Sequence, residues 1–237
     1  MAVLMTSNHS EFWDRRFQTE GAIWGESPSS TAQRAVGYLP AQARVLEVGF
    51  GYGRDLAFLL RHGFRVSGID LSREGRRRAE HRLRQEGLWP ETLVTGRFEE
   101  HPFPAGAFDA LLSHRMAHLL VTPEAVTRFA EEAARVLRPA GLLCLGARDP
   151  RDLERPVGLV PVVNQVYEYA DRPGHQIHYC WDEAAFEQTF GNAFEILSLT
   201  TTTELESAER PVPCHVTILI ARKRHAPRED TDSSSAP

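Results

Sequence analysis

The clearest indication of the fold is a short apolar run that ends in a glycine-rich loop. The run is Ala43-Arg-Val-Leu-Glu-Val48, and the loop that follows it is Gly49-Phe-Gly-Tyr-Gly53. Leucines then recur at helical spacing over residues 55–62, and Gly63 stands where a helix would end. The pattern predicts a buried strand, a tight turn and a helix whose free N–H groups can face a negative group.

The alternation of strands and helices continues along the chain. The expected strands are 43–48, 64–70, 93–96, 108–113 and 141–146, and the expected helices are 55–62, 72–87 and 124–137. Strands separated by helices of this length form a parallel sheet with helices on both faces. A helix at 182–190 then precedes two β-branched runs, 194–204 and 215–222, with only a Pro-containing turn between them. We therefore predict an α/β fold with a seven-stranded, mostly parallel sheet that ends in a C-terminal antiparallel hairpin.

Composition and charge are typical of one soluble domain. The chain has 237 residues, a net charge of −5 and 42% hydrophobic residues, so no overall basic field points to nucleic acid or an anionic membrane. We expect a flexible N-terminus at 1–10, one domain at 11–224 and a disordered tail at 225–237. No apolar stretch approaches the ~20 residues of a membrane helix and no secretory pattern opens the chain, which favours a cytoplasmic protein. Three scattered cysteines, and His175 and His178 beside a Pro-Gly pair, predict no metal site.

Two acidic residues accompany the glycine loop. Glu47 lies near the end of the first strand, and Asp70 ends the second, roughly 20 residues beyond the loop, where nucleotide-binding folds place a ribose-binding acid. One class of protein with a glycine loop and an acidic residue in such positions is the dinucleotide-dependent oxidoreductases. Its G-x-G-x-x-G fingerprint requires a glycine at the position of Arg54, and the antiparallel hairpin also argues against it.

Four segments resemble, in the same order, the motifs of class I S-adenosylmethionine-dependent methyltransferases. They are Glu47-Val-Gly-Phe-Gly-Tyr-Gly53, Gly68-Ile-Asp-Leu-Ser72, Pro102-Phe-Pro-Ala-Gly-Ala-Phe-Asp109 and Arg135-Val-Leu-Arg-Pro-Ala-Gly-Leu-Leu143. The resemblance covers about residues 40–147 and implies a Rossmann-like fold with S-adenosyl-L-methionine as cofactor. A narrower resemblance, to the tellurite-resistance and thiopurine methyltransferase branch, rests on segments 12–17, 23–25, 28–29, 53–55 and 172–179.

The resemblance implies a role for each residue at a matching position. The methionine part of the cofactor would lie against Trp24, Glu47, Gly49, Gly51, Gly53, Arg54 and the backbone of His114. Within this set, Glu47 would bind the amino group, Arg54 the carboxylate, and Trp24 would pack near the sulfonium.

The resemblance also implies which residues contact the nucleoside. Asp70 would bind the ribose, with Leu71 against the adenine and Phe98 bordering the base. Many relatives carry Asp where this chain has Arg97, so an acidic contact to the adenine amino group would pass to Glu99 or be replaced by backbone contacts.

Residues that act on the acceptor should follow the carboxyl ends of the strands, where open α/β sheets bind ligands. His118 is the candidate general base, and a structural histidine is the alternative. Arg115 and Arg148 are candidates for binding an anionic group of the substrate, or else pair with carboxylates. The insert 151–181 is the expected lid, and its His178 and Tyr179 are candidate substrate contacts, with simple packing as the alternative.

The predicted function is transfer of a methyl group to a heteroatom (S, O, N or a heavier chalcogen) of a small molecule by in-line displacement. A soft anionic acceptor would need no base, whereas a biosynthetic O- or N-methyltransferase would use His118. A non-catalytic cofactor-binding protein and an NAD-dependent oxidoreductase are the remaining alternatives. The arginines of the helix at 72–87 alternate with glutamates, which predicts a solvated surface and not a nucleic-acid groove.

Overall fold

The computed structural model describes residues 8–101, 103–154, 159–163, 166–169, 177–179, 181–208 and 211–225. Its main element is a seven-stranded sheet of order β3-β2-β1-β4-β5-β10-β9. The strands are β1 (Arg44–Val48), β2 (Arg65–Asp70), β3 (Thr92–Thr95), β4 (Phe108–His114), β5 (Leu137–Arg148), β9 (Phe194–Leu205) and β10 (Pro213–Lys223). The first five run parallel, and β10 pairs antiparallel with both β5 and β9. The predicted sheet and its C-terminal hairpin are confirmed.

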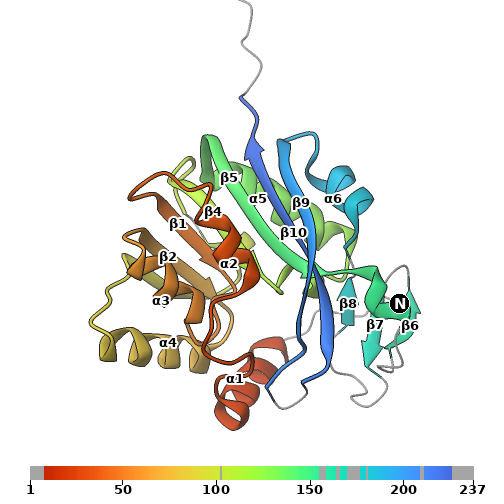
Figure 1. Cartoon of the computed structure of the whole chain (residues 1–237), viewed down its shortest axis with the longest axis horizontal. Helices are drawn as coiled ribbons and strands as arrows, with labels where there is room; N and C mark the ends of the chain where they lie inside the picture. The colour runs from red at the N-terminus through yellow and green to blue at the C-terminus, as the bar shows by residue number, and fades with distance from the viewer. Residues whose placement is uncertain are drawn as a thin grey trace, which may run out of the picture.

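Helices cover both faces of this sheet, as predicted (Figure 1). They are α1 (Asn8–Glu20), α2 (Ser30–Ala35), α3 (Arg54–Arg61), α4 (Arg73–Gln85), α5 (Pro123–Val136) and α6 (Glu183–Phe190), with short 3-10 turns η1 (Phe98–Glu100), η2 (Ala117–Leu119) and η3 (Pro150–Glu154). Alternation along each strand separates two cores: Val45 packs with α2, α3 and α4, whereas Leu46 and Val48 pack with α5 and α6. The core therefore fixes the strand register, and with it the loops at the strand ends.

Two parts of the chain contain secondary structure that the sequence did not predict. Helix α1 begins at Asn8, so the last residues of the segment expected to be flexible are helical. The expected lid contains a second, three-stranded antiparallel sheet made of β6 (Leu159–Val163), β7 (Val166–Tyr169) and β8 (Ile177–Tyr179). The tail from residue 226 and Cys180 lie outside the described residues. No helix in the described parts combines the length and apolarity needed to cross a bilayer.

Several segments that are distant in sequence meet at one edge of the large sheet. Figure 1 shows α1, the turn between β9 and β10, and the small β6–β8 sheet at the end of the molecule where β5 finishes. The carboxyl ends of β1, β2 and β4 lie at this same edge because these strands run parallel to β5. This edge is where an open α/β sheet binds ligands.

Candidate active site

A cavity lies over the carboxyl ends of β1, β2 and β4. Its wall includes all but one of the predicted cofactor-binding residues, namely Trp24, Glu47, Gly49, Gly51, Arg54, Asp70, Leu71, Phe98, Glu99 and His114. Helix α1 contributes His9, Trp13 and Phe17 to the same wall. Residues from at least five separate segments of the chain thus enclose one space.

The exception is Gly53, which lies outside the cavity wall. Its φ is +82°, and a Cβ there would lie 2.8 Å from the Cβ of Ala79 in α4. The glycine is therefore required by the close approach of α4 to the loop, and its place beside the methionine part stays a prediction.

Asp70 joins the end of β2 to the glycine loop. Its Oδ2 accepts a hydrogen bond from the Gly51 N–H at 2.8 Å, and its Oδ1 accepts one from the Ser72 N–H at 2.7 Å. Burial raises the pKa of Asp70 to about 6, although both backbone N–H groups favour its ionised form. The carboxylate is therefore held rigidly at the cavity wall and is close to its titration range at neutral pH.

Glu47 is a buried carboxylate on the other side of the loop. Its side chain is only 4% exposed, and its Oε2 has no hydrogen-bond partner among the described residues. Burial raises its pKa well above the usual value, and the negative charge of Asp55 adds to this effect. A buried acceptor without a partner is costly, so a cationic group bound in the cavity would offset an existing penalty.

Segment 23–30, which connects α1 to α2, crosses the cavity and is tied to the glycine loop. The Tyr52 hydroxyl donates to the Gly25 carbonyl at 2.7 Å and accepts from the Trp24 N–H at 3.1 Å. Arg54 donates to the Trp24 carbonyl at 3.1 Å. Asp55 accepts from the Ser29 N–H at 2.7 Å. Arg54, predicted to bind a carboxylate, thus also holds the segment that closes its own cavity.

Aromatic side chains form the inner side of this cover. Trp24 stacks on Tyr52 with ring centroids 6.2 Å apart and an interplanar angle of 14°. The ring centroids of Trp13 and Phe17 of α1 lie 5.9 Å and 6.5 Å from the ring centroid of Trp24. Helix α1 is itself held by a carboxylate of Asp14, which accepts from the Glu74 N–H at the start of α4 at 2.9 Å. The N-terminal segment is therefore an integral part of the site.

His114 carries a buried polar cluster that the sequence did not reveal. Its Nδ1 lies 2.8 Å from the Thr31 hydroxyl, and its Nε2 lies 3.1 Å from the Glu204 carboxylate. Glu204 also accepts from the Ser30 N–H at 3.1 Å. Burial opposes ionisation of Glu204, but His114, Ser30 and Arg115 outweigh it and hold the pKa of this carboxyl well below its usual range. Glu204 is distant in sequence, and only the β9–β10 pairing brings it here.

The predicted catalytic and substrate-binding residues occupy different places. Arg115 lies in the cavity wall, whereas His118, in η2, is 3% exposed and lies outside the wall. Arg148 is 2% exposed and also lies outside it. His178 and Tyr179 belong to β8, and the positions of their side chains are outside what the structure describes.

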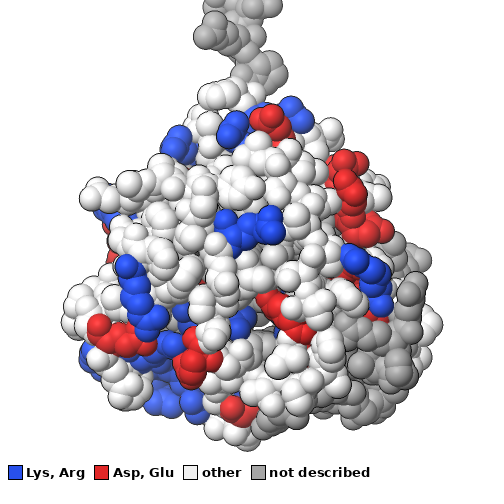
Figure 2. All heavy atoms as spheres, viewed as in Figure 1, with Lys and Arg blue, Asp and Glu red and all other residues white. Residues whose placement is uncertain are grey.

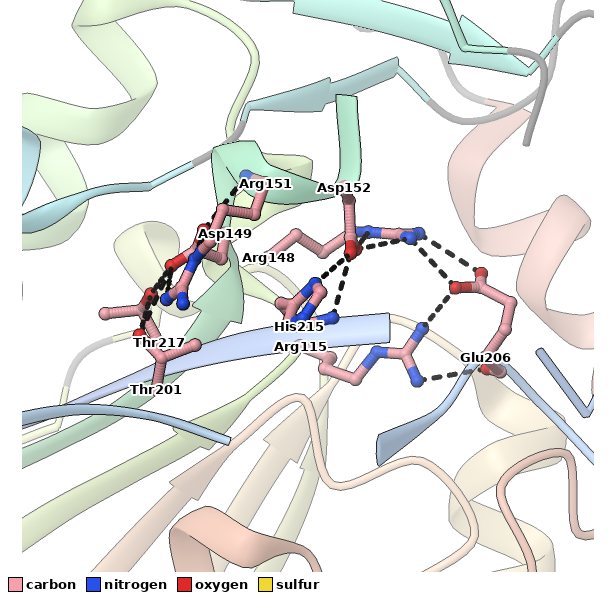
Figure 3. A network of polar contacts seen from close by, with 9 residues as sticks. All are labelled: Arg115, Arg148, Asp149, Arg151, Asp152, Thr201, Glu206, His215 and Thr217. Carbon is pink, nitrogen blue, oxygen red and sulfur yellow. Dashed lines mark hydrogen bonds and ion pairs between the residues drawn. The ribbon is translucent and has the colours of Figure 1, made fainter. Parts of the chain in front are cut away.

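Arg148 belongs to a buried network of charges at the base of the insert (Figure 3). Its guanidinium contacts Asp152 at 2.9 Å and Glu206 at 2.9 Å. Asp152 lies 3.1 Å from Nδ1 of His215, and Glu206 lies 3.4 Å from the guanidinium of Arg115. The side chain of the neighbouring Asp149 contacts Arg151, Thr201 and Thr217. Arg148 therefore fits the alternative that it pairs with carboxylates.

Comparison with known proteins gives a family for the central part of the chain. Residues 46–145 match a methyltransferase-domain family. The chain is 37% identical over 111 residues to a fatty-acid O-methyltransferase of Mycolicibacterium smegmatis, covering 46% of this chain and 38% of the relative. It is 33% identical over 131 residues to a phosphatidylethanolamine N-methyltransferase of Cereibacter sphaeroides, covering 54% and 63%. The chain thus spans only about a third to two thirds of the length of such relatives.

A solved structure shows the same fold over nearly the whole chain. It is the 1,6-didemethyltoxoflavin-N1-methyltransferase of Burkholderia thailandensis with its substrate and S-adenosylhomocysteine bound, with a TM-score of 0.64 and 18% identity. The match covers 92% of this chain and 85% of that one. Residues 46–145 thus match a methyltransferase domain, and the chain shares the Rossmann-like fold of this solved structure. The resemblance to the tellurite-resistance and thiopurine methyltransferase branch is not confirmed and stays a prediction.

Proposed function

We propose that this chain transfers the methyl group of S-adenosyl-L-methionine to a heteroatom of a small molecule. The observation that carries the proposal is the buried carboxylate of Glu47, whose Oε2 has no partner among the described residues and whose side chain belongs to the cavity wall. The ammonium of the methionine part is the group that such a carboxylate needs. S-adenosyl-L-methionine would supply an activated methyl group, and the chain's own residues would bind, orient and exclude water.

The other residues of the wall fit the rest of the cofactor. Asp70 would accept the ribose hydroxyls beside the loop that it already orders. Leu71 and Phe98 offer apolar surface for the adenine. Glu99, whose carboxylate lies 3.7 Å from the guanidinium of Arg97, would accept a hydrogen bond from the adenine amino group. Trp24 would lie toward the sulfonium, where an aromatic face attracts a cation.

Several observations favour a small molecule as the acceptor. The relatives named above act, by their names, on fatty acids and phosphatidylethanolamine, and the structural neighbour on 1,6-didemethyltoxoflavin. Arginines of α4 pair with Glu74 and Glu80, and Figure 2 shows basic and acidic side chains side by side over this part of the surface. Nucleic acid is therefore disfavoured as a partner. Cys144 and Cys214 are buried free thiols, in keeping with the proposed cytoplasmic location.

His118, Arg148, His178 and Tyr179 remain candidates for acceptor chemistry. For His118 to act as a base, η2 would have to move, because its imidazole is buried outside the cavity wall. Loss of the base-dependent limb from the pH profile of turnover in His118→Ala would favour this role.

The direct test is turnover with S-adenosyl-L-methionine and a panel of thiols, phenols, amines and carboxylic acids, with both products followed by mass spectrometry. We expect one methylated acceptor for each S-adenosylhomocysteine formed. Glu47→Gln should raise KM for the cofactor at least about tenfold, because it removes a charge-assisted hydrogen bond. Glu195→Gln, at an exposed ion pair on β9, is the control. Tight cofactor binding without a methylated product from any class would instead favour a non-catalytic cofactor-binding protein.

A further inference from the structure

Arg115 follows directly after β4 and lies in the cavity wall. Its φ is +55°, in the left-handed region that residues with a side chain rarely adopt, and its N–H donates to the Gly146 carbonyl at 2.7 Å. The guanidinium carbon lies 5.7 Å from the centre of the Trp24 ring. A strained backbone that persists at a ligand cavity is a reason to look for function there.

The guanidinium of Arg115 is buried but incompletely paired. Its side chain is 6% exposed. Nη1 donates to the carbonyls of Leu205 and Glu206 at 3.2 Å and 3.0 Å, and Nη2 lies 3.4 Å from the Glu206 carboxylate. Nε has no partner among the described residues. One donor of the planar fork is thus unused and another is only loosely paired.

Glu206 has a second and closer partner. Its carboxylate is 2.9 Å from Arg148, against 3.4 Å from Arg115, and Figure 3 shows it between the two guanidinium groups. An anion that reaches Arg115 can therefore replace Glu206 there while Glu206 keeps its contact with Arg148. This exchange leaves no buried charge unpaired, which is the usual obstacle to breaking a buried ion pair.

An acceptor that must lose a proton would need a base, and histidines of the cavity wall are the candidates. Among the described residues the wall holds two histidines, His9 and His114. Both ring nitrogens of His114 are already bonded, to Thr31 and Glu204. Burial and the charge of Arg97 lower the pKa of His9. An acceptor that is already ionised at neutral pH needs none of these groups.

We propose that the acceptor is a small apolar molecule bearing an ionised carboxylate, which binds Arg115 and is itself methylated. The inference rests on the proposed function. One oxygen would take hydrogen bonds from Arg115, and the other would bond to the methyl carbon with its own lone pair, while the methyl–sulfur bond breaks and its electron pair stays on sulfur. The anion and the sulfonium cation become a neutral ester and a neutral thioether, and no proton is removed. Loss of charge makes the step faster in an apolar cavity than in water.

Two acid and alcohol pairs with matched apolar parts test the proposal: laurate against 1-dodecanol, and 1-naphthoate against 1-naphthol. The wild-type protein should form methyl esters and leave the neutral partners unmethylated. Arg115→Gln should raise KM for the acid about 10- to 100-fold, the range expected for a charged hydrogen bond, without changing the affinity for S-adenosylhomocysteine. Arg115→Lys keeps the positive charge but loses the planar guanidinium, so its KM for the acid should lie between those of the wild type and Arg115→Gln.

Glu206→Gln separates anion binding from a structural role of the same pair. It removes the competing carboxylate, so KM for the acid should stay equal or fall. Arg76→Gln, at an exposed ion pair of α4, is the neutral control. Preferential methylation of 1-dodecanol or 1-naphthol would overturn the proposal while leaving methyl transfer intact. An equal rise of KM in Arg115→Gln and Glu206→Gln would also overturn it, whereas a protein that does not bind S-adenosylhomocysteine would fail the proposed function itself.

Discussion

The carboxylate of Asp70 accepts a hydrogen bond from the Gly51 N–H at 2.8 Å, so the last residue of β2 orders the loop that follows β1. Both ends of this contact line the cavity. The loop that must approach the cofactor is thus shaped by the same residue that is proposed to bind the ribose.

Cofactor binding should weaken as the pH falls through about 6. The pKa of Asp70 is raised to about 6 by burial, and a protonated carboxyl loses acceptor capacity for the ribose hydroxyls. Calorimetry from pH 7.5 to 5.5 should show a Kd for S-adenosylhomocysteine that rises several-fold. Asp70→Asn should bind at least about tenfold more weakly at pH 7.5 and depend less on pH. A wild-type Kd that is independent of pH would contradict this role.

Tyr52→Phe should loosen the cover of the cavity. It removes the hydroxyl that bonds both Trp24 and Gly25, so the free energy of unfolding should fall by about 1–2 kcal/mol and the cofactor Kd should rise. Urea unfolding and calorimetry measure the two effects. Tyr38→Phe, on a side chain that is 40% exposed, should change neither. Equal changes in unfolding free energy and cofactor Kd for the two substitutions would contradict the role of Tyr52 in holding segment 23–30 over the cavity.

Gly53→Ala should destabilise the fold more than Gly63→Ala. Both glycines have a positive φ, +82° and +78°, so both substitutions carry a similar backbone cost of about 1 kcal/mol. Only at Gly53 would the new Cβ meet α4, 2.8 Å from Ala79, whereas nothing lies within 4 Å at Gly63. We expect an additional loss of about 1–3 kcal/mol in urea unfolding. Equal losses would show that α4 can move away at little cost.

Glu204→Gln should destabilise the protein at neutral pH but less at acid pH. Because the pKa of Glu204 in the folded protein is held below its ordinary value of 4.5, its contribution is present above that value and is lost as the pH falls below it. Replacing it weakens the bonds to Ser30 and His114, for an expected loss of about 1–3 kcal/mol at pH 7. Unfolding at pH 7 and pH 4 should show the difference from wild type narrowing. A stability difference between wild type and Glu204→Gln that widens toward acid pH would contradict a lowered pKa of Glu204 in the folded protein.

The large sheet and the wall of the cavity around the glycine loop could be predicted because their signals are local. Glu47, the glycines and Asp70 stand at strand ends that hydrophobic periodicity defines, and ten of the eleven predicted cofactor residues line the cavity. For Gly53 the sequence does not say whether a ligand or a helix requires the glycine, and the structure shows the close approach of α4.

The cover and the acceptor side depend on contacts between distant segments. Tyr52 reaches back 28 residues to Trp24, and Glu204 lies 90 residues from His114. No spacing in the sequence encodes such pairs, since they follow from the placement of α2 and the β9–β10 turn. Arg148 looked equally suited to substrate and to structure, and only its burial between Asp152 and Glu206 distinguishes the two.

The most direct test of methyl-donor binding is isothermal titration of the wild-type protein with S-adenosylhomocysteine and, separately, with NADH. We expect saturable binding of S-adenosylhomocysteine at one site per chain, at least about tenfold weaker in Glu47→Gln, and no binding of NADH. Binding of NADH with no response to S-adenosylhomocysteine would contradict the assignment.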